Sequence, residues 1–495
     1  MQYDSPISSE SFQASLTGSN FSSATAAAIS TLLSLDTAAT VNLASWDGVS
    51  APLTPTGQTA AAEVVTGTIA GRTGDTVTLA IPDSLASAKA FVLDSNANLN
   101  VTFNPVAAAP AAQADEVSTF SAFSIAAAAV AADPATAAEF LVKTGNGDDI
   151  ITVTGNQNTY IDGGFGNDVI TATGSGNNTV VAGLGNNVIT TGTGNDTIVL
   201  SGVNHSDVVN TGAGYDVVQL DGSSANYSFV AGNNFDVTLN GTQGLGQTAA
   251  ITNAEFLSFT DSAGVISTVA LAHNEAEAAA LRLYQGVLGR DADLEGAKTF
   301  TGLVAAGTSL TNIANDFINS AEFGGARTDD YINTLYTTLL NRPADEAGSD
   351  NWVSVLANGG SLADVAAGIA GSAEAQAFDQ SNKTFVSELY SDILGREADE
   401  AGLQDWVSQL FNGTSRGEVA ANIVGSAEGV AKVNGDFIDS LYSNALDRTA
   451  DADGKANWLA VLADGGTQAD VAIGIVGSQE AIAHIDNVVV LHGAV

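Results

Sequence analysis

The stretch Gly163-Gly164-Phe165-Gly166-Asn167-Asp168-Val169-Ile170-Thr171 is the clearest copy of a unit that recurs every nine or ten residues between Thr144 and Gln219. Each copy opens with glycine, and six residues later (seven in one copy) it carries an aliphatic side chain. The glycines are Gly145, Gly155, Gly164, Gly174, Gly183, Gly192, Gly202 and Gly212. The aliphatic residues are Ile151, Ile161, Ile170, Val180, Ile189, Ile198, Val209 and Val218. A glycine turn followed by a short strand, repeated in this way, predicts a solenoid whose stacked aliphatics form the core that no single copy has.

The sixth position of each copy carries a polar side chain. These residues are Asp149, Thr159, Asp168, Asn178, Asn187, Asp196, Asp207 and Asp216. A carboxylate that follows G-x-G, beside carbonyls exposed by glycine, offers the hard oxygen ligands that calcium prefers. The block resembles the repeats-in-toxin (RTX) β-roll, whose nonapeptides bind Ca²⁺ between turns on one side of the roll. The resemblance implies a metal-ligand set consisting of Asp149, Asp168, Asn187, Asp196, Asp207 and Asp216 with the turn glycines Gly147, Gly166, Gly194 and Gly214.

Carried over to this sequence, the family's geometry makes alternate copies neighbours. Asp149 and Asp168 then share one ion, and Asp196 and Asp216 share another. Asp207 faces Asn187 with one carboxylate fewer, and we expect the pair Thr159 and Asn178 to be empty or poorly filled. His205 falls in an irregular turn, where we expect it to be exposed. A glycine solenoid without metal is the alternative, but its carboxylates would repel one another along the stack.

A second kind of repeat, with a helical period, follows from Glu275 to about Ala483. Its marks recur 52 to 54 residues apart: a tyrosine, then an arginine, an aspartate, a glycine, a large aromatic residue, a serine and a glutamate. The arginines are Arg290, Arg342, Arg396 and Arg448, and we expect them to bind aspartates and helix-end carbonyls within their own repeats. The array resembles a domain of unknown function, DUF4214, that is found after calcium rolls in secreted bacterial proteins.

The pattern predicts a multidomain chain that contains a parallel calcium β-roll and an all-α tandem-repeat array. Residues 221–272 resemble the β segment that closes such rolls, and the apolar C-terminal tail resembles the uncleaved signal of type I secretion substrates. A last strand or helix packed on the array is the alternative for the tail. The predicted segments are a β-rich domain and candidate assembly module at 1–105, an Ala-rich helical connector at 106–143, the calcium roll at 144–220, the β cap at 221–272, four helical repeats at 273–483 and the tail at 484–495.

Composition narrows the classes of partner. The chain has 14 basic and 55 acidic residues, a formal net charge of −41, and no cysteine. Such a charge repels phosphate backbones, which argues against nucleic-acid binding and favours multivalent cations. The absence of cysteine excludes disulfides and thiolate metal sites. No run of 18 apolar residues predicts a membrane span, and no cleaved N-terminal export signal is visible.

Two classes of function remain, and the sequence favours the first. The first is a secreted cell-surface structural protein that folds and self-assembles with calcium as an S-layer, sheath or filament, or an adhesin that binds a host ligand or a surface glycan or lipopolysaccharide. The second is a secreted hydrolase that uses the roll as a folding module. We expect no enzyme, because residues beyond 144 belong to repeats, cap or tail. The one nucleophile-elbow match, Gly413-Thr-Ser415-Arg-Gly417, lies where each helical repeat starts a helix, so Ser415 is predicted to be an N-cap.

Overall fold

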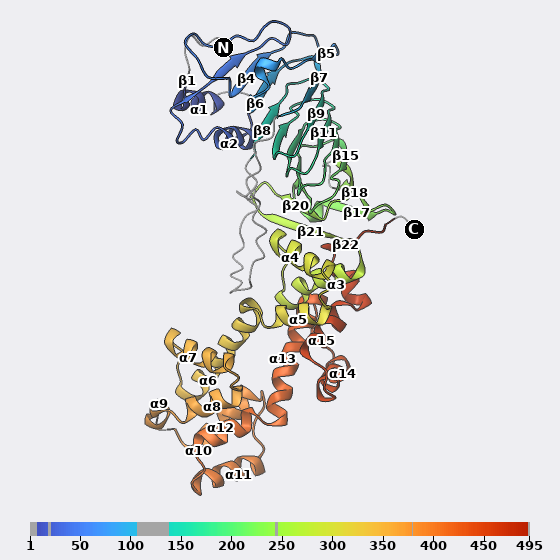
Figure 1. Cartoon of the computed structure of the whole chain (residues 1–495). Coiled ribbons are helices and arrows are strands. Elements are labelled where there is room, and N and C mark those ends of the chain that lie inside the picture. Colours follow the sequence, from blue (N-terminus) through green and yellow to red (C-terminus); the bar gives the residue numbers. More distant parts are fainter. Residues whose placement is uncertain (1–6, 18–20, 106–137, 243–245, 379, 494–495) are drawn as a thin grey trace.

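The computed structural model describes residues 7–17, 21–105, 138–242, 246–378 and 380–493 of the 495-residue chain. The molecule is elongated, with a strand-rich part at one end and helices at the other (Figure 1). No helix within the described residues is both long enough and apolar enough to pass through a bilayer.

Two large sheets make up the strand-rich part. The eleven-stranded sheet contains, in spatial order, β22 (Val488–Val490), β21 (Ile266–Ala272), β20 (Phe256–Thr260), β16 (Val217–Asp221), β14 (Thr197–Leu200), β12 (Thr179–Gly183), β10 (Thr159–Asp162), β8 (Phe140–Lys143), β6 (Ala90–Asp94), β4 (Val64–Thr68) and β3 (Leu43–Ser45). The nine-stranded sheet contains β17 (Tyr227–Ala231), β18 (Asp236–Gly241), β19 (Thr248–Thr252), β15 (Ser206–Asn210), β13 (Val188–Thr190), β11 (Val169–Thr173), β9 (Ile150–Thr154), β7 (Asn98–Phe103) and β5 (Thr76–Leu79).

The chain coils between these sheets, because consecutive strands from β4 to β16 alternate between them and pair in parallel with the strand one coil away. Equivalent positions of the repeat therefore lie directly opposite each other. Ile151 pairs with Ile170, and Ile170 with Ile189, and all three side chains are buried between the sheets. The aliphatic ladder read from the sequence is thus the core of the coil.

Glycine is required at the corners for two reasons. Gly164 and Gly183 have φ angles of +84° and +85°, in the region that side-chain-bearing residues avoid. A Cβ atom on Gly183 would also lie 1.8 Å from the carbonyl oxygen of Gly164, in the coil before it. The coils can stack at this spacing only because the corner has no side chain.

The N-terminal β-rich region is not a separate domain, which corrects the prediction for residues 1–105. β4 and β6 continue the eleven-stranded sheet into β8, and β5 and β7 continue the nine-stranded sheet into β9. The predicted helical connector is also wrong at its end, because residues 140–143 form β8, while residues 106–137 lie outside the described part. Gly71 and Gly74 lie between β4 and β5, but no glycine recurs at a nine- or ten-residue spacing from β4 to β7, so the period that marks the later coils is missing from these first coils.

The far end of the coil is closed by antiparallel strands. β19 and β20 pair in parallel with β15 and β16, and β17, β18 and β21 then turn back in antiparallel fashion. The last strand, β22, adds to β21 in parallel. Residues 488–490 of the tail therefore form a strand, as the alternative reading of the tail predicted, and its role as an export signal stays a prediction.

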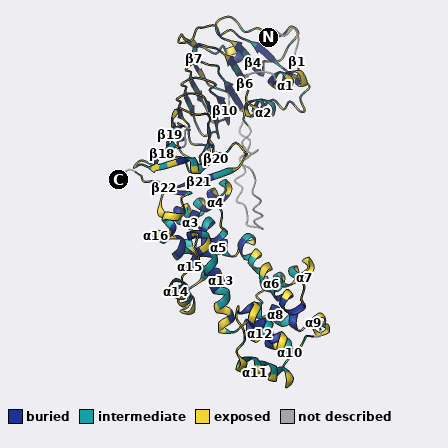
Figure 2. Ribbon diagram, turned by 180° about the vertical axis from the view of Figure 1, so that it is seen from behind, coloured by how far each residue is buried: buried dark blue, intermediate teal, exposed yellow. Residues whose placement is uncertain are grey.

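Helices cover the outer face of the eleven-stranded sheet at both ends. At the N-terminal end, α1 (Ser9–Thr17) and α2 (Ser23–Leu32), with the short pair β1 (Ile7–Ser8) and β2 (Thr40–Val41), share a buried cluster with Leu141 and Tyr160. At the other end, Val217 and Phe256 pack into the helical array. Figure 2 shows α2 beside the sheet at one end of the strand-rich part and α4 beside β20 and β21 at the other.

The helical array is built from two pairs of repeats rather than from one linear row. The first repeat shares a core with the fourth, and the second shares a core with the third. The first pair comprises α3 (Glu275–Leu283), η4 (Tyr284–Leu288), α4 (Leu294–Ala305), α5 (Leu310–Ile318) and η5 (Ala321–Gly325) with α13 (Ala427–Leu446), α14 (Ala452–Ala463), α15 (Gln468–Val476) and α16 (Gln479–His484). The second comprises α6 (Ala326–Leu340), α7 (Glu346–Ala357), α8 (Leu362–Ala370) and α9 (Ala373–Ala377) with α10 (Asn382–Glu388), η6 (Leu389–Ile393), α11 (Glu400–Phe411) and α12 (Arg416–Val424).

Candidate metal centre

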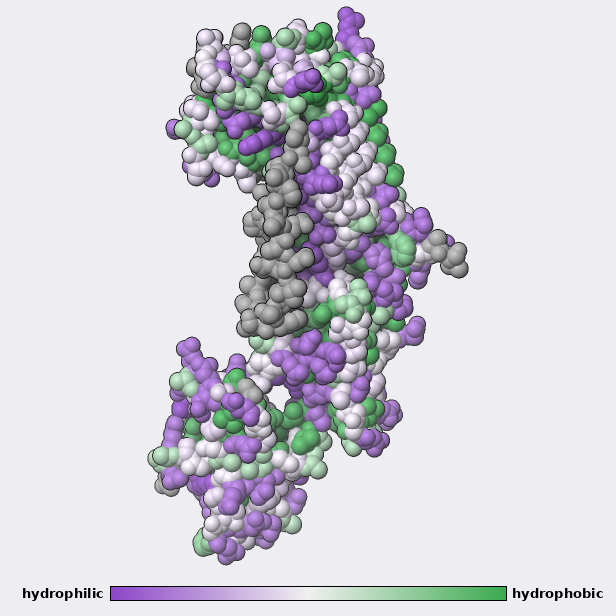
Figure 3. Space-filling model, in the orientation of Figure 1, coloured by the Kyte–Doolittle hydropathy of each residue, from purple (hydrophilic) through white to green (hydrophobic). Residues whose placement is uncertain are grey.

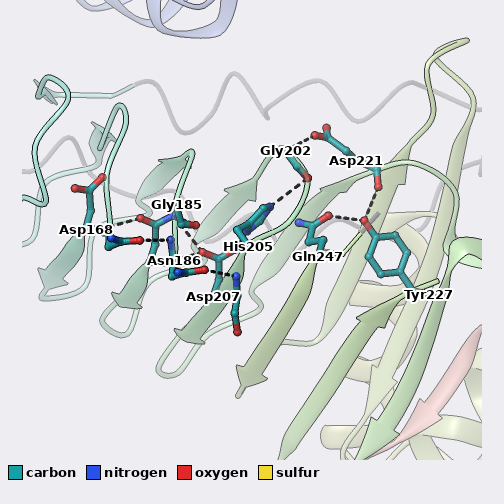
Figure 4. Close-up of polar contacts among 12 residues, drawn as sticks. Asp168, Gly185, Asn186, Gly202, His205, Asp207, Asp221, Tyr227 and Gln247 are labelled. Carbon is teal, nitrogen blue, oxygen red and sulfur yellow. Dashed lines mark hydrogen bonds and ion pairs between the residues drawn. The ribbon is translucent and has the colours of Figure 1, made fainter. Parts of the chain in front are cut away.

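The predicted ligands lie in two stacks inside the corners of the coil. The first stack consists of Asp149, Asp168, Asn187 and Asp207, at the entrances to β9, β11, β13 and β15. Each side chain accepts a backbone hydrogen bond from the coil before it: Asp168 Oδ1 from the N–H of Asp149 (2.8 Å), Asn187 Oδ1 from that of Asp168 (3.0 Å), and Asp207 Oδ1 from that of Asn187 (2.9 Å). Figure 4 shows the part of this stack between Asp168 and Asp207. Because an amide oxygen accepts as well as a carboxylate, asparagine can replace aspartate in the ladder.

The second stack lies on the opposite side and ends on a residue that the repeat pattern missed. Asn178 donates its N–H to Asp196 Oδ1 (2.7 Å), and Asp196 donates to Asp216 Oδ1 (2.7 Å). Asp216 in turn donates to Oε2 of Glu255 (2.6 Å), which precedes β20 as Asp216 precedes β16. Glu255 lies in the cap, outside the glycine period, so only its place before a strand of the closing segment could have indicated it.

The second carboxylate oxygen is what distinguishes the aspartates from their neighbours. Oδ2 of Asp149, Asp168, Asp196 and Asp216 is buried and accepts no hydrogen bond from any described residue. Burial, together with the charge of nearby aspartates, raises the pKa of Asp149 to about 6, of Asp216 to about 7 and of Asp168 to about 8. It also raises the pKa of Asp196. A buried carboxylate without a partner is costly, so each of these groups needs a proton or a cation.

Burial also raises the pKa of Glu255, to about 8, and the neighbouring Asp216 adds to the rise. The second stack therefore ends in two adjacent acids, Asp216 and Glu255. Nε2 of His273 lies 3.5 Å from Oε1 of Glu255, whereas Asp216 has no basic side chain among its described hydrogen-bond partners. This concentration of negative charge favours a divalent cation at the closed end of the coil.

The donor set fits calcium by its chemistry. Within the described residues, no three histidine, cysteine, aspartate or glutamate side chains converge as a metal cage. Side chains thus offer a bound ion two carboxylates at a time, from Asp149 with Asp168 and from Asp196 with Asp216. Further protein ligands must be carbonyl oxygens, which calcium accepts. Glycines expose such oxygens at the predicted positions. A Cβ on Gly166 would lie 2.1 Å from Gly147 O, and one on Gly214 would lie 2.2 Å from Gly194 O.

The structure brings together the pairs that the sequence predicted, and their role as ligands stays a prediction. The pair Thr159 and Asn178 has no carboxylate, and the side-chain amide of Asn178 donates to Asp196 Oδ1 (2.9 Å) as well as to its own turn. Thr159 donates its hydroxyl to Gln157 O (3.3 Å), and Asn178 donates its side-chain amide to Gly176 O (2.8 Å). This pair gives a cation nothing to neutralise.

Asp207 differs from the other aspartates because it has a titratable imidazole beside it. Nδ1 of His205 lies 2.6 Å from Asp207 Oδ2, and Nε2 lies 3.2 Å from Gly202 O (Figure 4). The hydrogen bond to Asp207 raises the pKa of His205. His205 is buried, which corrects the expectation that it is exposed. The residue inserted into this copy thus places an imidazole where the other copies leave a carboxylate oxygen without a partner.

The recurring charged groups of the helical array serve the repeats themselves. Arg290 binds both carboxylate oxygens of Glu322 (2.7 and 3.1 Å) and also reaches Asp293 (3.2 Å). The same arginine–glutamate pair recurs in the other three repeats, as Arg342 with Glu374, Arg396 with Glu428 and Arg448 with Glu480. Ser415 caps α12 and forms a capping box with Glu418, as its place in the repeat predicted.

Comparison with known families identifies both kinds of repeat. The family model described as RTX calcium-binding nonapeptide repeat (4 copies) matches residues 153–173 and 172–204. The model of DUF4214, a domain of unknown function, matches residues 276–327, 314–379, 376–433 and 429–485. No curated protein and no solved structure matches the chain. The chain therefore carries RTX nonapeptide repeats and four DUF4214 copies, and calcium is the ion that such nonapeptides bind.

Proposed function

We propose that the chain is a secreted bacterial surface protein that folds when it meets calcium outside the cell and then assembles with copies of itself into a layer, sheath or filament. The observation that carries this proposal is the row of buried carboxylate oxygens without partners in the two stacks. Such atoms make the closed coil unfavourable until a cation arrives. The nonapeptide family supports secretion, since its repeats are typical of exported proteins.

The stacks give calcium a direct effect on folding. In cytosol, where free calcium is scarce, Asp149 and Asp168 repel each other when ionised, as do Asp196 and Asp216, so the coil stays open. Outside the cell, the same side chains and the carbonyls beside them hold the ion, and its binding free energy becomes folding free energy. An unfolded chain is also the form that a type I secretion channel passes.

The environment of the recurring polar residues supports a structural role over a catalytic one. The repeated arginines hold glutamates and the repeated aspartates cap helices, as Arg290 holds Glu322 and Asp293 caps α4. Each of these groups therefore has a partner within its own repeat. Recurring charged residues that stabilise the fold of their own repeats are what we expect of a structural subunit.

Electron microscopy of the purified protein tests the assembly, with calcium in one sample and a chelator in the other. We expect ordered layers or filaments with calcium and separate particles with the chelator. Separate particles in both samples would reject assembly. Turnover of an ester, peptide or glycan substrate by the calcium-loaded protein would favour the secreted hydrolase instead.

A further inference from the structure

The outward face of the nine-stranded sheet is almost free of charge. On every strand of this sheet, outward positions alternate with core positions, and the structure describes all of them. They carry threonine, asparagine, serine, valine, isoleucine or alanine, and Asp236 on β18 is the one charged residue among them. In a protein of net charge −41, a surface of nine strands with a single charge is a marked exception.

A ladder of four β-branched side chains runs across four neighbouring strands of this sheet, at or close to their N-terminal ends. Ile150, Val169, Val188 and Val208 lie directly opposite one another on β9, β11, β13 and β15. Each is 41–51% exposed. In Figure 3, hydrophobic residues follow the edge of the strand-rich part on the side where this sheet lies. A continuous apolar ladder on an otherwise soluble surface indicates a site of contact.

The chain treats its two outer faces differently. The eleven-stranded sheet also carries apolar side chains outward, but helices of the same chain bury them, as α2 does over Leu141 and the helical array does over Val217. The exposure of the ladder residues shows that no helix among the described residues covers the nine-stranded face along β9 to β15. The fold thus closes one face and leaves the other open along the coil.

We infer that a second copy of this chain docks on the open face, sheet against sheet; the inference rests on the assembly proposed above and names the surface that carries it. Nine strands spaced about 4.8 Å apart, each presenting roughly 17 Å of length, make an area of about 700 Å² per copy. Two such faces bury about 1,400 Å² in total, which is the size of a stable interface.

The distribution of charge on the molecule favours a second copy of the chain as the partner at this face. Two molecules of net charge −41 repel through their acidic surfaces, and the uncharged sheet is where they can approach with least repulsion. The face is also self-complementary, because threonines and β-branched aliphatics pack well against the same residues in an aligned pair of sheets. A polyanionic partner would gain nothing at a face without basic residues.

Substitution of Val188 by lysine tests this inference. Val188 lies on β13, the central strand of the nine, and its side chain points outward, so Val188→Lys places an unpaired charge on this strand of the interface without entering the core. The control is Val430→Lys on α13, where the valine is 52% exposed and far along the chain from the sheet. Both variants should melt at the wild-type temperature in calcium, which shows that they fold.

Sedimentation velocity over a concentration series, with calcium present, gives the readout. We expect the wild type and Val430→Lys to associate equally, and Val188→Lys to associate about tenfold more weakly or not at all. Equal association of Val188→Lys would overturn this inference but leave assembly through another surface in place. A wild type that stays monomeric would overturn both. Binding of monomeric wild type, but not Val188→Lys, to an insoluble glycan would assign the face to another partner and also overturn the inference.

Discussion

Each aspartate of the stacks uses its two carboxylate oxygens differently. In Asp168, Oδ1 accepts a backbone hydrogen bond from the preceding coil, while Oδ2 is buried without a partner. Asn187 does the first task but carries no charge. At Asp207, the imidazole of His205 takes the place of a cation. The ladder of backbone-to-side-chain hydrogen bonds is therefore common to the whole stack. Only the aspartates without a partner for Oδ2 require a divalent ion.

Replacing Asp168 by asparagine should separate these two tasks. Asp168→Asn keeps the acceptor for the N–H of Asp149 but removes the buried charge. We expect the calcium-free protein to gain about 1–3 kcal/mol of stability at neutral pH, and the protein to lose one bound calcium. Urea unfolding in chelator and calcium titration calorimetry measure the two effects.

The matched control for this variant is Asp148→Asn. Asp148 is exposed, and its Oδ1 accepts the N–H of Asn167 in the same manner. It should leave the calcium count unchanged and raise the calcium-free stability much less than Asp168→Asn, because the charge of Asp148 is only a minor cause of the raised pKa of Asp168. Equal effects of the two substitutions would mean that burial of the Asp168 carboxylate does not matter.

The raised pKa values set the direction of the pH dependence without calcium. Asp149, Asp216 and Asp168 have folded pKa values of about 6, 7 and 8, above the usual 3.8. The folded state therefore holds protons that the unfolded state releases, and stability falls as the pH rises from about 4 to about 8. His205, whose pKa is also raised, loses its contribution in the same direction.

Melting temperatures in chelator should accordingly be higher at pH 5 than at pH 8. With calcium the trend should weaken or reverse, because the ion competes with protons for the same oxygens. Calorimetry at both pH values checks this. A calcium-free melting temperature that increases with pH would show that these carboxylates do not carry unpaired charge.

At the scale of the element, the corner of each coil depends on two properties of glycine that can be tested separately. Gly183 and Gly57 have nearly the same φ, +85° and +84°. A Cβ on Gly57 would meet nothing within 4 Å, whereas one on Gly183 would meet Gly164 O at 1.8 Å. Gly57→Ala therefore reports the backbone conformation alone, at about 1–2 kcal/mol.

Gly183→Ala should cost clearly more, about 4 kcal/mol or above, because the coils must also move apart. Urea unfolding of both variants in calcium measures the difference. Similar losses for the two alanines would show that the stacked corners are not in tight contact.

The sequence predicted the coils wherever glycine turns repeat and missed them elsewhere. Gly164 and Ile170 mark their coil because a tight corner and a core position impose fixed residue types. β4 to β7 belong to the same sheets, but the connections between them differ in length, so no residue type recurs there at a fixed spacing. Glu255 was missed for the same reason, since it joins the second stack from a cap with no repeat. His205 was placed wrongly because its insertion hides that it points at Asp207.

The sequence predicted correctly that the recurring arginines of the helical repeats bind within their own repeats. The physical reason for the fixed spacing of the other recurring residues is visible only in the structure. Glycine follows tyrosine at a fixed distance because the hydroxyl of Tyr336 packs against Gly348, where a Cβ would lie 2.5 Å away. The indole of Trp352 donates to the same hydroxyl at 3.2 Å. In the first repeat Phe300 cannot donate, and the buried hydroxyl of Tyr284 has no partner among the described residues.

At the scale of the whole molecule, the helical repeats pair out of sequence order. The cluster from Ile332 to Val424 contains the second and third repeats only. The first repeat instead packs with the fourth and with the end of the strand-rich part, through residues such as Val217. The chain thus leaves the coil, makes an outlying pair of repeats, and returns to the coil, where β22 joins β21.

This arrangement predicts which fragments fold alone. A fragment of residues 326–426 holds the complete second core and should melt cooperatively by circular dichroism. A fragment of residues 275–379, also two consecutive repeats, divides both cores and should not. The opposite result would show that neighbours in sequence, rather than the observed pairs, form the folding units.

The central claim is that the coil cannot close on its buried acids without a divalent ion. Differential scanning calorimetry of the full chain, in millimolar calcium and then in EGTA, tests it most directly. At calcium concentrations well above the dissociation constant, each occupied site adds roughly 3–4 kcal/mol to the stability of the folded state. The melting temperature of the strand-rich part should therefore be about 10 °C or more higher in calcium than in EGTA, or its transition should be absent in EGTA. The outlying helical pair should melt at the same temperature in both samples. Identical traces for the strand-rich part would contradict the claim.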